Sequence, residues 1–159
     1  MNEVRIRPAE PRDVSALADL RWQFKLEDSD GSEEPESEAV FVKRCADWLR
    51  TRILTGPWRV WLAEVSGQPC GQVFLGLVDK VPSPFGGSTM LGYVANFYVT
   101  PEHRNRGLGA ALLAEVTRYA EAQSLDTLIV WPSDRSAPLY RRCGFDQPAE
   151  LLEVPVAPS

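Results

Sequence analysis

The segment that decides the fold is Val99-Thr100-Pro101-Glu102-His103-Arg104-Asn105-Arg106-Gly107-Leu108-Gly109-Ala110, in which a predicted strand leads into a predicted helix. The first backbone N–H groups of a helix have no partner within the helix, and together with the helix dipole they form a site for an anion. Gly107 and Gly109 have no Cβ, so a phosphate can approach the backbone closely. Arg104 and Arg106 add positive charge, and the segment therefore predicts a pyrophosphate site.

Two common phosphate-binding patterns fit this segment poorly. A P-loop requires lysine and then serine or threonine after a glycine, and no lysine follows Gly107 or Gly109. A dinucleotide-binding turn requires glycine or alanine where Leu112 stands. Such a turn also belongs to an opening βαβ unit, whereas the chain before this segment is predicted to form antiparallel hairpins. Another interpretation stays open, in which the two glycines only let a helix pack closely on a sheet. That interpretation leaves the two arginines before the glycines unexplained.

Hydrophobic periodicity and turn residues predict the elements in the rest of the chain. The predicted strands cover residues 4–7, 59–65, 70–81, 89–99, 125–131 and 145–156, and the predicted helices cover 11–27, 38–54, a stretch beginning near 107, and 137–143. The order is β-α-α-β-β-β-α-β-α-β. It predicts an α/β fold with a central mixed sheet flanked by helices, antiparallel in the middle and parallel around the helix near 107. Without a repeat or a linker, we expect one domain over residues 1–159.

Composition argues against several function classes. The chain has 17 basic and 22 acidic residues, a net charge of -5 that disfavours non-specific nucleic-acid binding. The cysteines Cys45, Cys70 and Cys143 are odd in number and widely spaced, so neither a disulfide framework nor a metal site is predicted. The first residues lack the apolar core of a signal peptide, and no apolar run approaches the roughly 20 residues of a membrane span. We therefore expect a cytoplasmic protein without a membrane partner.

Two motifs resemble those of a known superfamily. Arg104, Gly107 and Gly109 match the pattern Arg/Gln-x-x-Gly-x-Gly/Ala, so the segment resembles motif A of the GNAT superfamily of acyl-CoA-dependent N-acyltransferases. The stretch from Leu139 to Phe145 resembles the Leu-Tyr-x-x-x-Gly-Phe motif near the end of these proteins. The motifs stand in the family's order, and the order of elements agrees over nearly the whole chain.

The resemblance implies how acetyl-CoA would be held. The strand ending at Val99 would splay from the strand ending at Trp131, and the pantetheine arm would pair with the backbone of Phe97, Tyr98 and Val99. The pyrophosphate would lie on the amides of the following turn, which comprises Arg104, Asn105, Arg106, Gly107, Leu108, Gly109 and Ala110. Many members have asparagine and alanine where this chain has Ser133 and Ser136, and a serine can still donate a hydrogen bond to the cofactor.

The same resemblance assigns Tyr140 as the general acid that protonates the leaving thiolate. A phenol with a pKa near 10 is protonated at neutral pH and can donate, whereas the alternative is a core aromatic beside Phe145. No general base is identified. The candidates are acidic residues for which the alternative, a solvated surface position, is favoured: Glu64, Glu27, Asp28, Glu33 and Glu34. His103 would lie at the pyrophosphate end, far from the thioester.

The acceptor site is predicted only in outline. Trp22, Glu27 and Asn96 are its candidate residues, with structural roles as the alternative for each. The acidic stretch from Glu27 to Glu38 would attract a cationic amine, or it is a solvated loop.

The predicted function is an N-acetyltransferase that moves an acetyl group from acetyl-CoA to a primary amine, on a small molecule or a protein, by direct attack in a ternary complex. A non-catalytic acyl-CoA-binding sensor or interaction module is the alternative, and a binder of nucleotide phosphates is a third hypothesis. Apolar residues on the last predicted strand are compatible with a homodimer.

Overall fold

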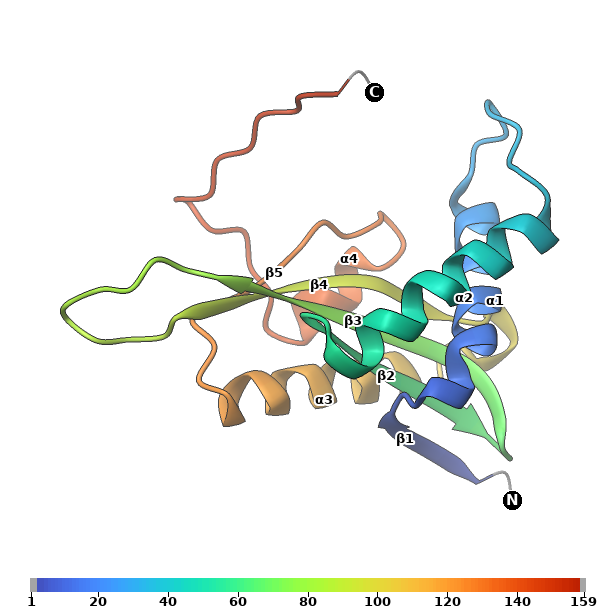
Figure 1. Cartoon of the computed structure of the whole chain (residues 1–159), viewed down its shortest axis with the longest axis horizontal. Helices are drawn as coiled ribbons and strands as arrows, with labels where there is room; N and C mark the ends of the chain where they lie inside the picture. Colours follow the sequence, from blue (N-terminus) through green and yellow to red (C-terminus); the bar gives the residue numbers. More distant parts are fainter. Residues whose placement is uncertain (1–2, 158–159) are drawn as a thin grey trace.

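A computed structural model of the chain describes residues 3–157 and has a five-stranded sheet at its centre, with strand order β1-β2-β3-β4-β5 (Figure 1). The strands are β1 (Val4–Pro8), β2 (Trp58–Val65), β3 (Gln68–Asp79), β4 (Met90–Val99) and β5 (Leu128–Val130). The helices are α1 (Val14–Asp28), α2 (Glu38–Thr55), α3 (Leu108–Ala122) and α4 (Ala137–Arg142), with 3-10 turns at Pro11–Asp13 and Pro101–His103. Strands β1 to β4 pair antiparallel and β5 joins β4 in parallel, which confirms the predicted mixed sheet flanked by helices.

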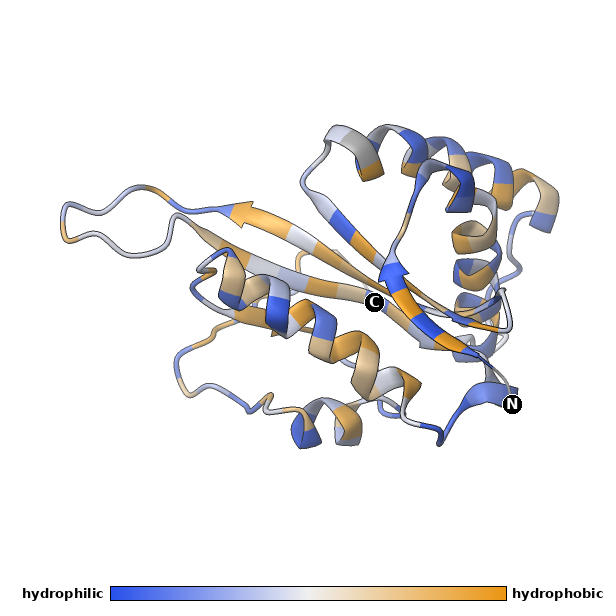
Figure 2. Cartoon of the chain, turned by 90° about the horizontal axis from the view of Figure 1, so that it is seen from below, coloured by the Kyte–Doolittle hydropathy of each residue, from blue (hydrophilic) through white to orange (hydrophobic). Residues whose placement is uncertain are grey.

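Helices cover both faces of the sheet. On one face α3 presents Leu108, Leu112 and Val116, which recur every four residues and so form one buried stripe. On the other face α1 and α2 bury Leu17 and Leu49 against the sheet. The apolar stripes of helices and strands that meet in these two layers are visible in Figure 2. Both faces of the central strands are therefore buried, and the strand ends are left to build a site.

A β-bulge in β4 changes which way its side chains point. The pairing register jumps from Gln72 opposite Tyr98 to Phe74 opposite Ala95, and Asn96 adopts a left-handed conformation with φ 51°. The extra residue reverses the alternation of the strand. In a regular strand Val94 and Val99, five positions apart, would point to opposite faces. Because the bulge lies between them, both pack in the layer of α3.

The bulge lies where β4 loses one neighbour. Pairing with β5 ends at Val94 opposite Val130, while β4 continues to Val99. From Ala95 onward β4 is paired with β3 alone among the described strands. The two strands therefore separate at this point, which the family resemblance had led us to expect.

Two sequence predictions need correction at the C-terminal side. The predicted strand over 145–156 is wrong, because the described chain after α4 forms neither strand nor helix and runs out from the sheet (Figure 1). Pro155 has no N–H for a ladder, and Leu152 and Val156 are more than 90% exposed. Strand β5 is also shorter than predicted, because the amide of Leu125 donates to the carbonyl of Ala120 and closes α3 instead.

A buried ion-pair network fixes the start of α1 to the sheet. The guanidinium of Arg7 on β1 donates to both carboxylate oxygens of Asp13, at 2.7 and 2.8 Å, and to Glu64 on β2 at 2.7 Å. These side chains are 8%, 8% and 14% exposed. The hydrogen bond from Arg7 lowers the pKa of the Asp13 carboxyl. The same carboxylate accepts a hydrogen bond from the backbone amide of Glu10 and so also stabilises the turn before α1.

The three cysteines are free thiols. Within residues 3–157, no group of three histidine, cysteine or acidic side chains is placed to hold a metal ion. Over the same residues, no helix combines the length and the apolar character needed to cross a membrane.

Candidate functional site

The turn from residue 104 to residue 110, here the glycine turn, joins β4 to α3. Asn105 and Gly107 both have left-handed backbone conformations, with φ 61° and 81°. The backbone amides from Asn105 through Ala110 find no hydrogen-bond acceptor elsewhere in the described chain. Consecutive free amides at the start of a helix favour a bound anion. The geometry therefore fits the pyrophosphate site predicted from the sequence.

The two glycines of this turn have different roles. A Cβ on Gly109 would come within 2.7 Å of Leu139 and 3.1 Å of Phe97, so this glycine lets α3 pack closely on the sheet and on α4. A Cβ on Gly107 would meet nothing within 4 Å. Close packing thus accounts for Gly109, whereas Gly107 provides the left-handed turn and leaves the backbone open to an approaching group.

Glu27, at the end of α1, is bound by three side chains. It accepts hydrogen bonds from the Tyr98 hydroxyl and from Arg104, both at 2.9 Å, and it forms an ion pair with Arg135. Burial alone would raise the pKa of Glu27, but the hydrogen bonds from Tyr98 and Arg104 outweigh it and the pKa is lowered. Arg104 also donates to the carbonyl of Val99 at 2.9 Å. Glu27 is therefore an ionised, fully engaged residue beside the glycine turn and lies outside the cavity described next.

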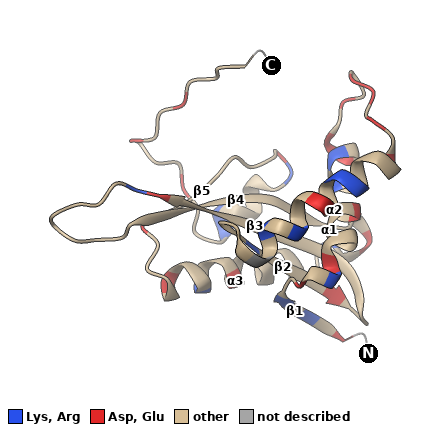
Figure 3. Ribbon diagram, viewed as in Figure 1, with Lys and Arg blue, Asp and Glu red and all other residues tan. Residues whose placement is uncertain are grey.

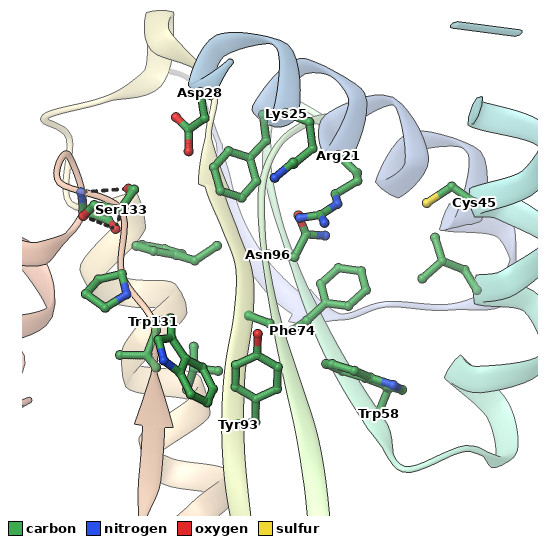
Figure 4. A pocket seen from close by; sticks show the side chains of 18 of the residues that line it. Arg21, Lys25, Asp28, Cys45, Trp58, Phe74, Tyr93, Asn96, Trp131 and Ser133 are labelled. Carbon is green, nitrogen blue, oxygen red and sulfur yellow. Dashed lines mark hydrogen bonds between the residues drawn. The ribbon is translucent and has the colours of Figure 1, made fainter. Parts of the chain in front are cut away.

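A cavity of about 660 Å³ opens where β4 and β5 separate (Figure 4). It is lined by β4 residues 94–97, by residues 130–133 after β5, by α1 and α2, and by Tyr140 of α4. Asn96 and Ser133 both line it and lie on opposite sides of β4 in the view of Figure 4. The sequence predictions for Asn96, Phe97, Ser133, Ser136 and Tyr140 therefore meet in one place.

Tyr140 belongs to the buried core and also lines the cavity. The residue is 3% exposed, and its ring contacts those of Phe97 and Phe145 at centroid distances of 5.4 and 5.2 Å. Its hydroxyl has no hydrogen-bond partner in the described chain, yet it is not among the fully enclosed polar atoms. Burial, with a smaller effect of the nearby Tyr93, raises the pKa of Tyr140, so the phenol keeps its proton.

Ser133 and Ser136 bond to one another. Their hydroxyl oxygens lie 2.9 Å apart, and the amide of Ser136 donates to the Ser133 hydroxyl at 3.2 Å. This arrangement fixes the chain between β5 and α4. Each hydroxyl can still accept or donate one further bond toward the cavity.

The α1 side of the cavity contains residues that the sequence analysis did not name for the acceptor site, although it named Asp28 as a candidate base. Arg21, Phe24, Lys25 and Asp28 line it, at the spacing of one helix face. Trp22 is turned about 100° away and lies instead in a neighbouring cavity. The signal was present in the sequence, because Arg21 interrupts the otherwise apolar face of this helix.

The loop between α1 and α2 is acidic (Figure 3). Its Glu33 and Glu34 line that neighbouring cavity, of about 570 Å³, which Arg21 and Lys25 of α1 also line. Glu64 is held by Arg7 at β1, away from both cavities. His103 shares a hydrogen bond with Thr100 at 2.9 Å. Of the carboxylates in residues 3–157, Asp28 is the one that lines the larger cavity, and it is paired with Arg135 at 3.1 Å.

The sequence model of the acetyltransferase (GNAT) family matches residues 15–145, a range that contains the glycine turn, the cavity-lining part of α1 and Tyr140. The chain belongs to the GNAT acetyltransferase family. A curated relative, glucosamine 6-phosphate N-acetyltransferase of Trypanosoma brucei brucei, is 24% identical over 144 residues, which cover 90% of this chain and 89% of the relative.

Solved structures of GNAT proteins share the fold. A predicted acetyltransferase with acetyl-CoA from Clostridium acetobutylicum superposes with a TM-score of 0.79 at 21% identity, covering 96% of each chain. A GCN5-related N-acetyltransferase from Ralstonia eutropha JMP134 superposes with a TM-score of 0.78 at 24% identity, and the match covers 97% of this chain and 99% of that protein's chain. At these identities the comparison establishes the GNAT fold alone.

Proposed function

We propose that this chain transfers the acetyl group of acetyl-CoA to a primary amine by direct attack in a ternary complex. Membership of the GNAT family supports acyl transfer in general. The observation that carries the proposal is Tyr140, which lines the cavity where β4 and β5 separate and whose hydroxyl has no hydrogen-bond partner within the described chain. A packing role alone would require the ring of this residue and not its hydroxyl.

The residues present fit coenzyme A as the donor. The free amides from Asn105 through Ala110 would hold the pyrophosphate, helped by the exposed Arg106. The unpaired edge of β4 from Ala95 to Val99 would hold the pantetheine amides, as an added strand would be held. When bound, the donor supplies an acetyl group activated as a thioester.

The side chains of the cavity would then manage the protons. As the amine nitrogen bonds to the carbonyl carbon and the carbon–sulfur bond breaks, Tyr140 would place its phenol proton on the leaving sulfur. The proton that the amine loses would then restore the neutral phenol. Asn96 would help to orient the amine. Glu27 takes no part as a base, because its oxygens are occupied by Tyr98, Arg104 and Arg135.

Release of coenzyme A tests this function. We expect acetyl-CoA and a panel of amines to give thiol release, detected with a thiol reagent, above the rate without amine. In a thermal-shift comparison, coenzyme A should raise Tm more than ATP at equal concentration. Binding without release for any amine would indicate an acyl-CoA-binding module, and a larger shift with ATP would indicate a nucleotide binder.

The substitution Gly107→Ala separates binding from stability. The left-handed φ of 81° costs alanine about 1 kcal/mol, and the new Cβ would stand where the pyrophosphate approaches. We expect the Kd for coenzyme A to rise about tenfold, or ~1.4 kcal/mol, measured by titration calorimetry. Gly86→Ala is the control, since Gly86 also has φ 81° and open surroundings but lies in the loop between β3 and β4. Equal affinities of the two variants would contradict the assignment of the glycine turn.

A further inference from the structure

Two cations on α1 face the cavity without a counterion. Arg21 and Lys25 project from α1 toward the cavity beside Asn96 (Figure 4). No ion pair in residues 3–157 includes either side chain. The other two charges on the cavity wall are neutralised, since Arg44 pairs with Glu36 and Asp28 pairs with Arg135. The cavity therefore carries a net positive charge on its α1 side.

The position of Arg21 makes this charge costly to leave alone. Its guanidinium donates to the side-chain oxygen of Asn96 at 3.3 Å and lies 5.8 Å from the centre of the Phe24 ring. Burial lowers the pKa of Arg21, because water is removed and no carboxylate replaces it. A partly buried cation without a counterion is unfavourable, and a bound anion would offset that cost.

The remaining wall of the cavity is aromatic. The rings of Tyr93 and Trp131 contact each other edge to face, with their centroids 5.4 Å apart, and the ring centroids of Trp58 and Tyr93 are 6.3 Å apart. Flat apolar walls suit the uncharged body of a ligand. A cavity of about 660 Å³ falls in the range that proteins use for small molecules.

We propose that the acceptor is a small amine that also carries a carboxylate or a phosphate, and that Arg21 and Lys25 bind this anionic group. The role of this ligand as acceptor rests on the proposed acetyl transfer, whereas the binding of an anion by Arg21 and Lys25 does not depend on it. It replaces the expectation that the acidic loop draws in a cationic amine. That loop lines the neighbouring cavity, and its Glu36 is bound to Arg44. With Tyr140 in the same cavity, the anion would hold the ligand from the α1 side and leave the amine free to reach the reacting carbon.

Matched ligand pairs test the anion site by binding, independently of turnover. Phenylalanine against phenethylamine varies a carboxylate, and glucosamine 6-phosphate against glucosamine varies a phosphate. Titration calorimetry is run on the full chain with and without saturating coenzyme A. In at least one pair we expect the anionic member to bind about tenfold or more tightly than its partner. The pair that shows this preference identifies the anion as carboxylate or phosphate.

Variants then assign the preference to its residues. Arg21→Gln and Lys25→Gln should each reduce the tenfold preference to near equality, and Arg21→Lys should retain part of it. Lys43→Gln is the matched control, because it removes one positive charge from the exposed surface of α2, outside the cavity. Lys25 is itself solvent-exposed, so its variant reports on binding even if Arg21→Gln unfolds.

Two results would overturn the anion site: no tighter binding of the anionic member in either pair, or a preference that survives in both glutamine variants. Failure of the acetyl transfer has a different signature. In that case coenzyme A is not released, while the calorimetric preference for the anionic ligand persists.

Discussion

Replacement of Tyr140 by phenylalanine is expected to lower kcat about 100-fold or more, the usual contribution of a positioned general acid. The aromatic ring, and with it the contacts to Phe97 and Phe145, is retained in this variant. Only the hydroxyl is removed, and it has no partner within the described chain. We therefore expect little change in Tm or in the Kd for acetyl-CoA.

Steady-state kinetics with acetyl-CoA and a productive amine measure this effect. Tyr119→Phe is the matched control, because Tyr119 is a partly buried tyrosine of α3 that accepts a hydrogen bond from Arg59 outside the cavity. The pH profile adds a second readout. Because burial raises the pKa of Tyr140 above its ordinary value of 10.0, wild-type kcat should show no alkaline decline from this group up to about pH 10. An unchanged kcat in the phenylalanine variant would remove Tyr140 from the mechanism.

Replacement of Asp13 by alanine is expected to lower the free energy of unfolding by about 3–5 kcal/mol, the usual cost of breaking a buried ion pair from one side. Arg7 would lose both of its hydrogen bonds to Asp13 while remaining buried. The amide of Glu10 would lose its acceptor as well. Urea unfolding followed by tryptophan fluorescence measures the change.

The exposed ion pairs of α2 provide the comparison for this network. Asp47 pairs with Lys43 and Arg50 in solvent, so Asp47→Ala should change stability little. A similar loss in both variants would show that burial of the network is unimportant.

Acid should weaken the same network. The pKa of Asp13 is lowered in the folded chain below the ordinary 3.8, so its stabilisation is complete above about pH 4 and is lost as pH falls through the folded pKa. In Asp13→Asn the free energy of unfolding should therefore decline less steeply than in the wild type as the pH falls below about 4.

The glycine turn could be predicted from the sequence because it depends on backbone conformation near specific residue types. Glycines at 107 and 109, and the spacing to Tyr140, describe a turn and a helix that local rules can predict. Local rules did not predict the bulge at Asn96, because it depends on pairing between β3 and β4. The missing last strand has the same origin, since a strand forms only where a neighbour offers a free edge.

The cavity was harder to predict than the glycine turn because it combines residues far apart in the chain. Lys25 and Trp131 belong to the same cavity although more than half of the sequence separates them. Glu27 looked like an acceptor residue from its charge, but only the fold shows that Tyr98 and Arg104 already bind it. The sequence therefore shows which residues are charged, but only the fold shows which of those charges stay unpaired.

Helix α1 supports both ends of the proposed reaction. Lys25 lines the cavity, while Glu27, two residues later, holds Arg104 and Arg135 beside the glycine turn. A donor that draws Arg104 toward its phosphates would loosen the contact to Glu27, and would so act on the helix that we propose binds the acceptor. Thermodynamic linkage then requires each substrate to change the affinity of the other by an equal factor. We expect the two substrates to bind interdependently, with the KM of one varying with the concentration of the other.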